Sequence, residues 1–172
     1  FWDLLYEGDA AGTYSPFERL PSALLERRFL AENDARIAER LAVLDDRRAA
    51  KRYLLRVSVA RFGTPNGLFR WRQPVLDAMH ALIDTAPADG LRRIMLQFCD
   101  DYQGMRHGYP DLMVIDEAGV RFVEVKSDGD QLRRNQLLRL EQLRSAGFRA
   151  EVLRVRWVLD PAQAYVVVDV ET

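Results

Sequence analysis

Three charged side chains in the second half of the sequence have the types and the spacing to do chemistry together. Asp111 follows Pro110, and Glu124 and Lys126 lie further along with one residue between them. Side chains alternate between the two faces of a strand, so a strand here places Glu124 and Lys126 on one face, about 7 Å apart. With Asp111 at the mouth of a partner strand, two carboxylates and an amine converge at one edge of a sheet.

This trio suits the hydrolysis of a phosphodiester. Oxygen ligands hold hard divalent cations, and Mg²⁺ takes only one or two protein carboxylates, so Asp111 and Glu124 are enough for one ion. Such a metal acidifies water and polarises a phosphoryl oxygen. Lys126 would orient the nucleophile or neutralise the developing charge. The same pattern also fits a turn aspartate followed by a surface Glu/Lys pair, which contributes little to stability.

The elements predicted around these residues describe a mixed sheet with a helix on one face, in the order β-β-α-β-β. Leu112 to Ile115 is a continuous apolar run, typical of a buried strand. The other predicted elements are a turn at 117–119, a strand at 120–125, a helix at 130–146 ended by Gly147, and strands at 148–158 and 165–170.

Gln136 lies on the predicted apolar stripe of that helix, with Leu132, Leu140 and Leu143. Burying its amide unpaired costs about 1 to 3 kcal/mol. It therefore needs a partner, which is either a backbone group or the group of carboxylates and nucleophile. Arg133 and Arg134 flank it at the start of the helix, where they would either hold a nucleic-acid backbone or be solvated.

The first hundred residues predict helices and no clear strand. Apolar residues recur at mostly helical spacing from Leu20 to Leu44, with an interruption where Asn33 or Asp34 could cap a new helix. Further helices are expected from Pro74 to Asp84 and after Pro87. A basic stretch, 47–56, would either touch phosphates or keep a helix soluble. We therefore divide the chain into a helical segment, 1–103, and a mixed α/β core, 104–172.

Composition limits the class of protein. The chain has 172 residues, 48% of them hydrophobic and 30% charged, as in a globular domain. One cysteine excludes an internal disulfide framework and a cysteine zinc cluster. No apolar run approaches the roughly 18 residues of a membrane span. Residues 121–156 hold nine basic and five acidic side chains, so this segment is positive while the rest is negative.

Three short motifs are distinctive in combination. They are Gly108-Tyr109-Pro110-Asp111-Leu112, then Val123-Glu124-Val125-Lys126, then Asn135-Gln136 followed by Leu140, Leu143 and Gly147. Together, over about residues 106–157, they resemble the virus-type replication-repair nuclease (VRR-NUC) domain of the PD-(D/E)XK superfamily. The first residues, Phe1-Trp2-Asp3, and the helices after them look like the C-terminal region of the Fanconi-associated nucleases, including bacterial relatives.

The resemblance implies a PD-(D/E)XK restriction-endonuclease-like core preceded by a helical segment, with Mg²⁺ or Mn²⁺ as cofactor. It implies a structure-specific DNA nuclease, a 5′-flap endonuclease or 5′–3′ exonuclease, in interstrand cross-link repair. Asp111 and Glu124 would be metal ligands together with the Val125 carbonyl, Lys126 the catalytic lysine, and Gln136 the motif glutamine. Candidate DNA contacts are Arg106, Arg133 and Arg134.

Further expectations follow from the same resemblance. In these nucleases another metal-binding glutamate, and most of the DNA-binding surface, lie upstream of the Phe/Trp-Asp stretch. The apolar start at Phe1 indicates a fragment of a longer protein. We therefore expect these 172 residues alone to bind metal weakly and to cut poorly without the N-terminal remainder. The expected location is the cytoplasm, with the nucleoid, in a bacterium, or the nucleus in a eukaryote, and no membrane partner is expected.

Two other readings remain open from the sequence. A stand-alone nuclease of the junction-resolvase type would work as a dimer, although the helical segment and the truncated start argue against it. A non-catalytic DNA-binding or scaffolding domain would use only its arginines. Replacing Lys126 by alanine separates catalysis from binding, because only a catalytic site loses cleavage while keeping most of its DNA affinity.

Overall fold

The structure, a computed structural model, describes residues 1–7, 19–159 and 164–171. The chain forms two compact units, residues 1–105 and residues 106–172. Within the described ranges, every helix is too short or too polar to cross a lipid bilayer.

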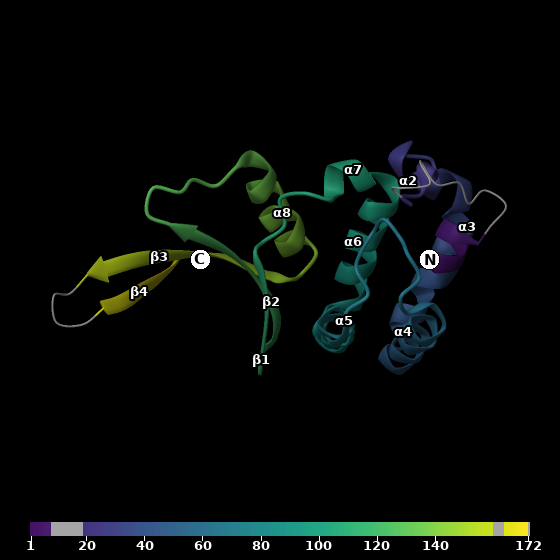
Figure 1. Ribbon diagram of the computed structural model, residues 1–172, viewed down its shortest axis with the longest axis horizontal. Helices are drawn as coiled ribbons and strands as arrows, with labels where there is room; N and C mark the ends of the chain where they lie inside the picture. The colour runs from purple at the N-terminus through teal and green to yellow at the C-terminus, as the bar shows by residue number, and fades with distance from the viewer. Residues whose placement is uncertain (8–18, 160–163, 172) are drawn as a thin grey trace. The chain divides into compact units, whose positions relative to one another are not determined.

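The first unit is helical, as its sequence predicts (Figure 1). Its elements are α1 (Trp2–Tyr6), α2 (Ser22–Leu25), α3 (Phe29–Ala42), the 3-10 turn η1 (Val43–Asp45), α4 (Arg47–Arg61), α5 (Gln73–Thr85), α6 (Ala88–Asp100) and α7 (Tyr102–Met105). The expected interruption is present inside α3, where Asn33 leaves helical geometry and Asp34 accepts a hydrogen bond from the next N–H.

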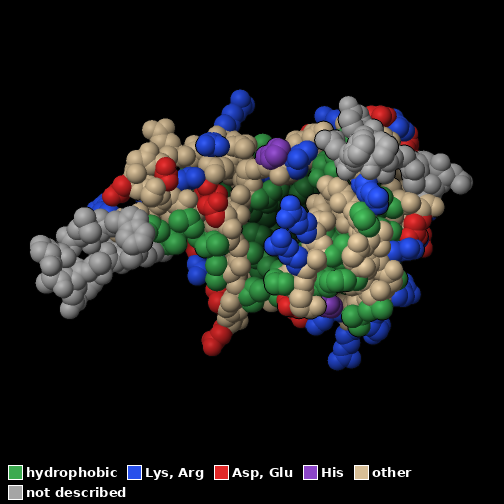
Figure 2. Space-filling view, viewed as in Figure 1, with side chains coloured by type: hydrophobic (Ala, Val, Ile, Leu, Met, Phe, Trp, Pro, Cys, Tyr) green, Lys and Arg blue, Asp and Glu red, His purple; other side chains and the backbone are tan. Residues whose placement is uncertain are grey.

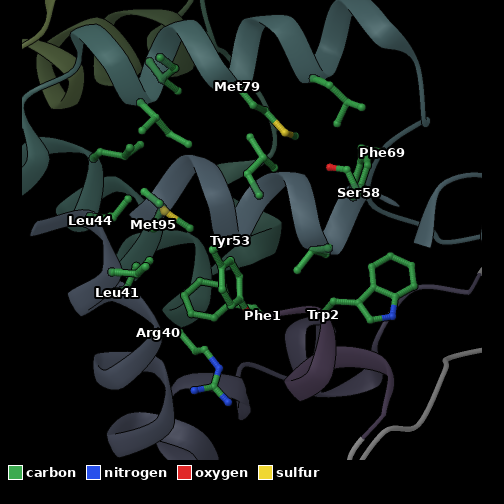
Figure 3. Close-up of a pocket in the computed structure, with 18 of the residues that line it drawn as sticks. Phe1, Trp2, Arg40, Leu41, Leu44, Tyr53, Ser58, Phe69, Met79 and Met95 are labelled. Atoms are coloured by element: carbon green, nitrogen blue, oxygen red, sulfur yellow. The ribbon is translucent and has the colours of Figure 1, made fainter. Parts of the chain in front are cut away.

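The core of this unit is apolar and comes from α1, α2, α3 and α6. Its buried side chains are Leu4, Ala23, Leu24, Phe29, Ile37, Leu41 and Cys99. Beside it lies an apolar cavity of about 450 Å³ (Figure 3), lined among others by Trp2, Tyr53 and Met79. Side chains of α4, α5 and α6 therefore turn inward, and α4 presents its other face to the outside.

The second unit is a mixed sheet with one helix. Its elements are β1 (Leu112–Asp116), β2 (Gly119–Ser127), α8 (Arg134–Ser145), β3 (Arg149–Leu159) and β4 (Ala164–Glu171). The strand order is β1-β2-β3-β4; β2 and β3 run parallel, and both outer pairs are antiparallel. Helix α8 connects the two parallel strands and packs against β3 (Figure 1), which confirms the predicted β-β-α-β-β order.

Two predictions about this unit are wrong in detail. The strand β1 is not buried: Leu112 and Ile115 are 48% and 49% exposed, because β1 lies at the edge of the sheet. Helix α8 begins at Arg134 and not at Asp130, because Asp130 closes a turn in which its N–H donates to the Ser127 carbonyl. Leu132 consequently precedes the helix, whereas Leu140 and Leu143 are buried on it as predicted.

Candidate active site

Glu124 and Lys126 form a buried ion pair on β2. Lys126 Nζ donates to Glu124 Oε1 at 2.5 Å, and the two residues are only 9% and 1% exposed. Alternation along the strand brings the two side chains to one face, as the sequence predicts. A buried charge is costly unless it is paired and hydrogen-bonded, so each of these two groups makes the burial of the other tolerable.

Gln136 connects helix α8 to this pair. Its Nε2 donates to Glu124 Oε1 at 2.5 Å, and its Oε1 accepts from the Arg133 N–H at 2.9 Å. The sequence left a choice between a backbone partner and the carboxylates, and the side chain has both. The amide oxygen of Gln136 accepts from a backbone N–H at the start of α8 that has no partner within the helix, and the amide nitrogen holds the carboxylate of Glu124.

The second oxygen of Glu124 has no hydrogen-bond partner within the described part of the chain. Oε1 accepts from both Lys126 and Gln136, whereas Oε2 is buried and lacks a hydrogen-bond donor among the described residues. A buried carboxylate oxygen without a partner costs free energy. It is also the group that a cation with oxygen ligands would satisfy, so the donor set here fits a hard divalent metal.

Asp111 contacts the backbone of the residue next to Glu124. It lies just before β1, it is exposed, and its Oδ2 accepts from the Val125 N–H at 2.9 Å. The β1–β2 pairing ends with Leu112 opposite Val123, so the Asp111 side chain extends the hydrogen bonding of β2 past the end of β1. This contact places the Asp111 carboxylate beside the Glu124 position.

The segment before Asp111 fits tightly against α8. Gly108 has φ of +86°, and a β-carbon there would lie 2.8 Å from the backbone carbon and oxygen of Asn135. Only glycine combines this conformation with so close an approach. The loop that carries Asp111 and the helix that carries Gln136 are thus in direct contact.

Arg139 is a buried residue whose importance sequence reasoning missed. It is 4% exposed, its Nε donates to the His107 carbonyl at 3.1 Å, and its guanidinium lies 5.6 Å from the centre of the Tyr109 ring. Burial raises the pKa of Tyr109 to about 12, so this ring stays neutral under ordinary conditions. Arg139 lies three residues after Gln136, on the same side of the helix. This spacing could have indicated from the sequence that Arg139 also faces the candidate site.

A tight turn follows Lys126 immediately. Asp130 Oδ2 accepts from the Ser127 N–H at 3.0 Å and from the Ser127 hydroxyl at 2.6 Å. The bond from the hydroxyl is the main cause of a lowered pKa at Asp130. The turn fixes the end of β2 at the position where the lysine side chain leaves the strand.

The remaining candidate residues are Val125, which follows Glu124 in the chain, and three arginines. Val125 is half-buried in β2, and Arg106, Arg133 and Arg134 are exposed. Arg133 immediately precedes α8 and Arg134 begins it. Their proposed DNA contacts stay predictions. Among the described residues, no three histidine, cysteine or acidic side chains gather into a metal cluster.

The fold and the matches with known proteins agree on a class. A mixed sheet with its connecting helix and a buried Glu-x-Lys pair on the second strand is the PD-(D/E)XK-like nuclease fold. The chain belongs to the VRR-NUC domain family, whose profile matches residues 41–157. The resemblance expected from the motifs is confirmed, and the match extends upstream to include α4 to α7.

Relatives and solved structures point in the same direction. The chain is 28% identical over 162 residues to the Fanconi-associated nuclease 1 homolog of Pseudomonas aeruginosa, covering 92% of this chain and 29% of the relative. It is 29% identical over 162 residues to the homolog of Schizosaccharomyces pombe, covering 90% and 22%. Less than a third of either relative's length is therefore spanned.

Two crystal structures of paFAN1, one bound to 2nt 5′flap DNA with gap and one bound to 1nt 5′flap DNA with gap, are similar in fold. Their TM-scores are 0.76 and 0.79, each at 28% identity and each covering 92% of this chain and 29% of the other.

Proposed function

We propose that this chain is the catalytic part of a metal-dependent, structure-specific DNA nuclease that cuts phosphodiester bonds near 5′ flaps. The observation that carries the proposal is the buried Glu124 carboxylate: one oxygen accepts from Lys126 and Gln136, and the other has no partner among the residues that the structure describes. Family membership and relatives named as Fanconi-associated nucleases support the reaction class, and relatives bound to 5′ flap DNA support the substrate. Both 5′-flap endonuclease and 5′–3′ exonuclease action are included, with interstrand cross-link repair as the setting.

The proposed metal ligands are the side chains of Asp111 and Glu124 and the Val125 carbonyl. The N–H and C=O of one strand residue point to the same side, so the Val125 carbonyl faces the edge at which its N–H meets Asp111. A bound Mg²⁺ or Mn²⁺ would supply Lewis acidity and lower the pKa of a water molecule. Because the described residues gather only two carboxylates here, we propose that the longer protein adds a further ligand.

The protein groups have separate tasks in this proposal. Lys126 holds a positive charge where the phosphate gains negative charge in the transition state, and its ion pair with Glu124 fixes its position. Gln136 fixes the rotamer of Glu124, which leaves Oε2 turned away from the ion pair. Both contacts are made within the protein itself, so they would position these groups for the reaction without help from the substrate.

The test is cleavage of a labelled 5′-flap DNA by the longest natural protein that contains this chain, with Mg²⁺ or Mn²⁺. Glu124→Gln keeps the shape of the side chain and removes its charge. We expect it to abolish incision while DNA affinity in EDTA is retained. The control is Glu117→Gln, which changes an exposed glutamate in the β1–β2 turn of the same hairpin.

The results for incision and DNA binding distinguish a nuclease from a non-catalytic DNA-binding domain. Loss of incision in Glu124→Gln alone, with thermal stability similar in both variants, supports the proposed site. Equal incision by the wild type and Glu124→Gln places the reaction elsewhere. Binding of flap DNA without incision by any of these proteins favours the non-catalytic DNA-binding domain. As a DNA nuclease, the protein would act at the nucleoid in a bacterium or in the nucleus of a eukaryote.

A further inference from the structure

Helix α4 carries a row of arginines on its outer face. Arg48, Arg52 and Arg56 follow one another at four-residue spacing and are all exposed. Four residues advance a helix by about 6 Å, so the row is about 12 Å long. In the space-filling view, basic side chains lie next to exposed hydrophobic surface at the lower edge of the helical unit, where Figure 1 places α4 (Figure 2).

The row differs from most of the other basic side chains of its unit. Arg47 and Lys51 on the same helix are held by α5, since Lys51 donates to the Asp84 carboxylate at 2.7 Å and Arg47 donates to the Asp84 carbonyl. Arg61, at the end of the same helix, pairs with Glu7, and five arginines elsewhere in the described part of this unit carry ion pairs: Arg27, Arg28, Arg36, Arg40 and Arg92. Within the same part, no carboxylate pairs with the row on α4.

Keeping this row costs the helix stability. Its 15 residues contain six basic side chains and no acid. Like charges four residues apart repel one another, and Arg48 stands in the first turn, where the helix dipole disfavours a cation. The N-cap Asp46 stabilises the start of the helix, because its carboxylate accepts from the N–H groups of Arg48 and Ala49. It does not pair with the guanidinium groups of the row. An arrangement with this internal repulsion gains stability when a polyanion covers it.

We propose that the outer face of α4 is a second DNA-contact surface, outside the candidate active site, that holds the phosphate backbone of the substrate. The proposal rests on DNA being the substrate. Guanidinium groups match phosphates in geometry as well as charge, and they keep their charge at any working pH. About 12 Å of the DNA axis carries three to four phosphates on each strand, at 3.4 Å per phosphate, so each arginine of the row has a phosphate within the same length.

The C-terminal half of the same face marks the limit of this surface. Leu55, Val59 and Phe62 are 56%, 76% and 58% exposed; Leu55 lies between Arg52 and Arg56 in the sequence, Val59 follows Arg56, and Phe62 comes directly after the helix. Apolar side chains gain little from phosphate, so we assign the DNA contact to the arginines. A protein partner with an acidic, apolar face is the competing occupant, and it would need both halves.

The experiment measures the affinity of the longest natural protein for a fluorescein-labelled 5′-flap DNA by anisotropy, in EDTA, over a range of salt concentrations. The test variant is Arg48→Gln/Arg52→Gln/Arg56→Gln, because glutamine keeps the helix propensity. The control, Arg27→Gln/Arg28→Gln/Arg36→Gln, removes the same charge from exposed arginines that already have acidic partners. A third variant, Leu55→Gln/Val59→Gln, probes the apolar half.

We expect the α4 arginine variant to bind about tenfold more weakly or worse near 0.1 M salt. Its slope of log affinity against log salt should become shallower by about 2 to 3, because about 0.9 is lost per phosphate contact. The control and the Leu55/Val59 variant should stay within about twofold of the wild type. The α4 arginine variant should also melt at an equal or higher temperature, because repulsion within the helix is removed.

Several results would overturn the proposal. An unchanged salt slope in the α4 arginine variant shows that the row does not touch DNA. Equal losses in the α4 variant and the control show a general charge effect and no localised surface. A loss of DNA affinity in the Leu55/Val59 variant alone assigns the face to apolar contacts. Binding is measured without metal, so a protein that binds flap DNA and never cuts contradicts the proposed nuclease while this surface is still tested.

Discussion

The side-chain amide of Gln136 donates a hydrogen bond to Glu124 Oε1 at 2.5 Å, joining helix α8 to the buried carboxylate on β2. The same oxygen also accepts from Lys126, which leaves Oε2 as the free end of the carboxylate within the described residues. The position of α8 therefore determines the orientation of the Glu124 carboxylate.

Replacing Gln136 by leucine should reduce cleavage by at least about tenfold, because small displacements of catalytic groups cost large factors in rate. It also removes partners of Glu124 and of the Arg133 N–H, so we expect a loss of about 1 to 3 kcal/mol in the free energy of unfolding. Flap-cleavage rates and urea denaturation measure the two effects. The control is Gln131→Leu, at an exposed position before the helix. Equal losses of cleavage and stability in the two variants would contradict a specific role for Gln136.

Replacing Arg139 by methionine should loosen the loop before Asp111, because its Nε no longer holds the His107 carbonyl. We expect amide hydrogen exchange in peptides covering residues 106–112 to speed up by about tenfold, the equivalent of one hydrogen bond. This is measured by mass spectrometry without metal. Arg144→Met is the matched control, since Arg144 on the same helix donates to the Ala150 carbonyl instead. Similar loosening of 106–112 in the control would mean that any weakening of α8 frees the loop.

Substitutions at two glycines with the same backbone conformation can distinguish the cost of backbone strain from the cost of a steric clash. Gly108 and Gly129 both have φ of +86°, but a β-carbon at Gly108 meets the Asn135 backbone, whereas one at Gly129 meets nothing within 4 Å. Gly129→Ala should cost about 1 to 2 kcal/mol from the left-handed conformation alone. Gly108→Ala should cost about 1 to 3 kcal/mol more and reduce cleavage, because α8 and the Asp111 loop must move apart. Equal denaturation midpoints for the two variants would contradict the close approach.

The turn after Lys126 should depend on pH through Asp130. Its pKa is lowered, mainly by the hydrogen bond from the Ser127 hydroxyl. A lowered carboxyl pKa contributes stability above the ordinary value of about 3.9, and this stability is lost as the pH falls through the lower folded-state pKa. In Ser127→Ala, the pKa of Asp130, followed by carboxyl-carbon NMR, should rise toward the ordinary value. An unchanged pKa would assign the shift to the backbone N–H of Ser127.

The local pattern of the sequence determined the elements and the identity of the central residues. Strand alternation is enough to place Glu124 and Lys126 on one face, and helical periodicity is enough to place Gln136 with Leu140 and Leu143. Both patterns act between near neighbours in the chain. They were therefore readable without knowing which strands pair or what covers them.

The contacts between distant segments were decided only by tertiary structure. The contacts of Asp111 with Val125 and of Arg139 with His107 join residues 14 and 32 positions apart, and no periodicity encodes them. The exposure of Leu112 likewise follows from the place of β1 at the sheet edge, because an apolar run specifies a strand and not its neighbours. The sequence by itself determined which groups could do chemistry, and the packing of α8 on the sheet decided how they are held.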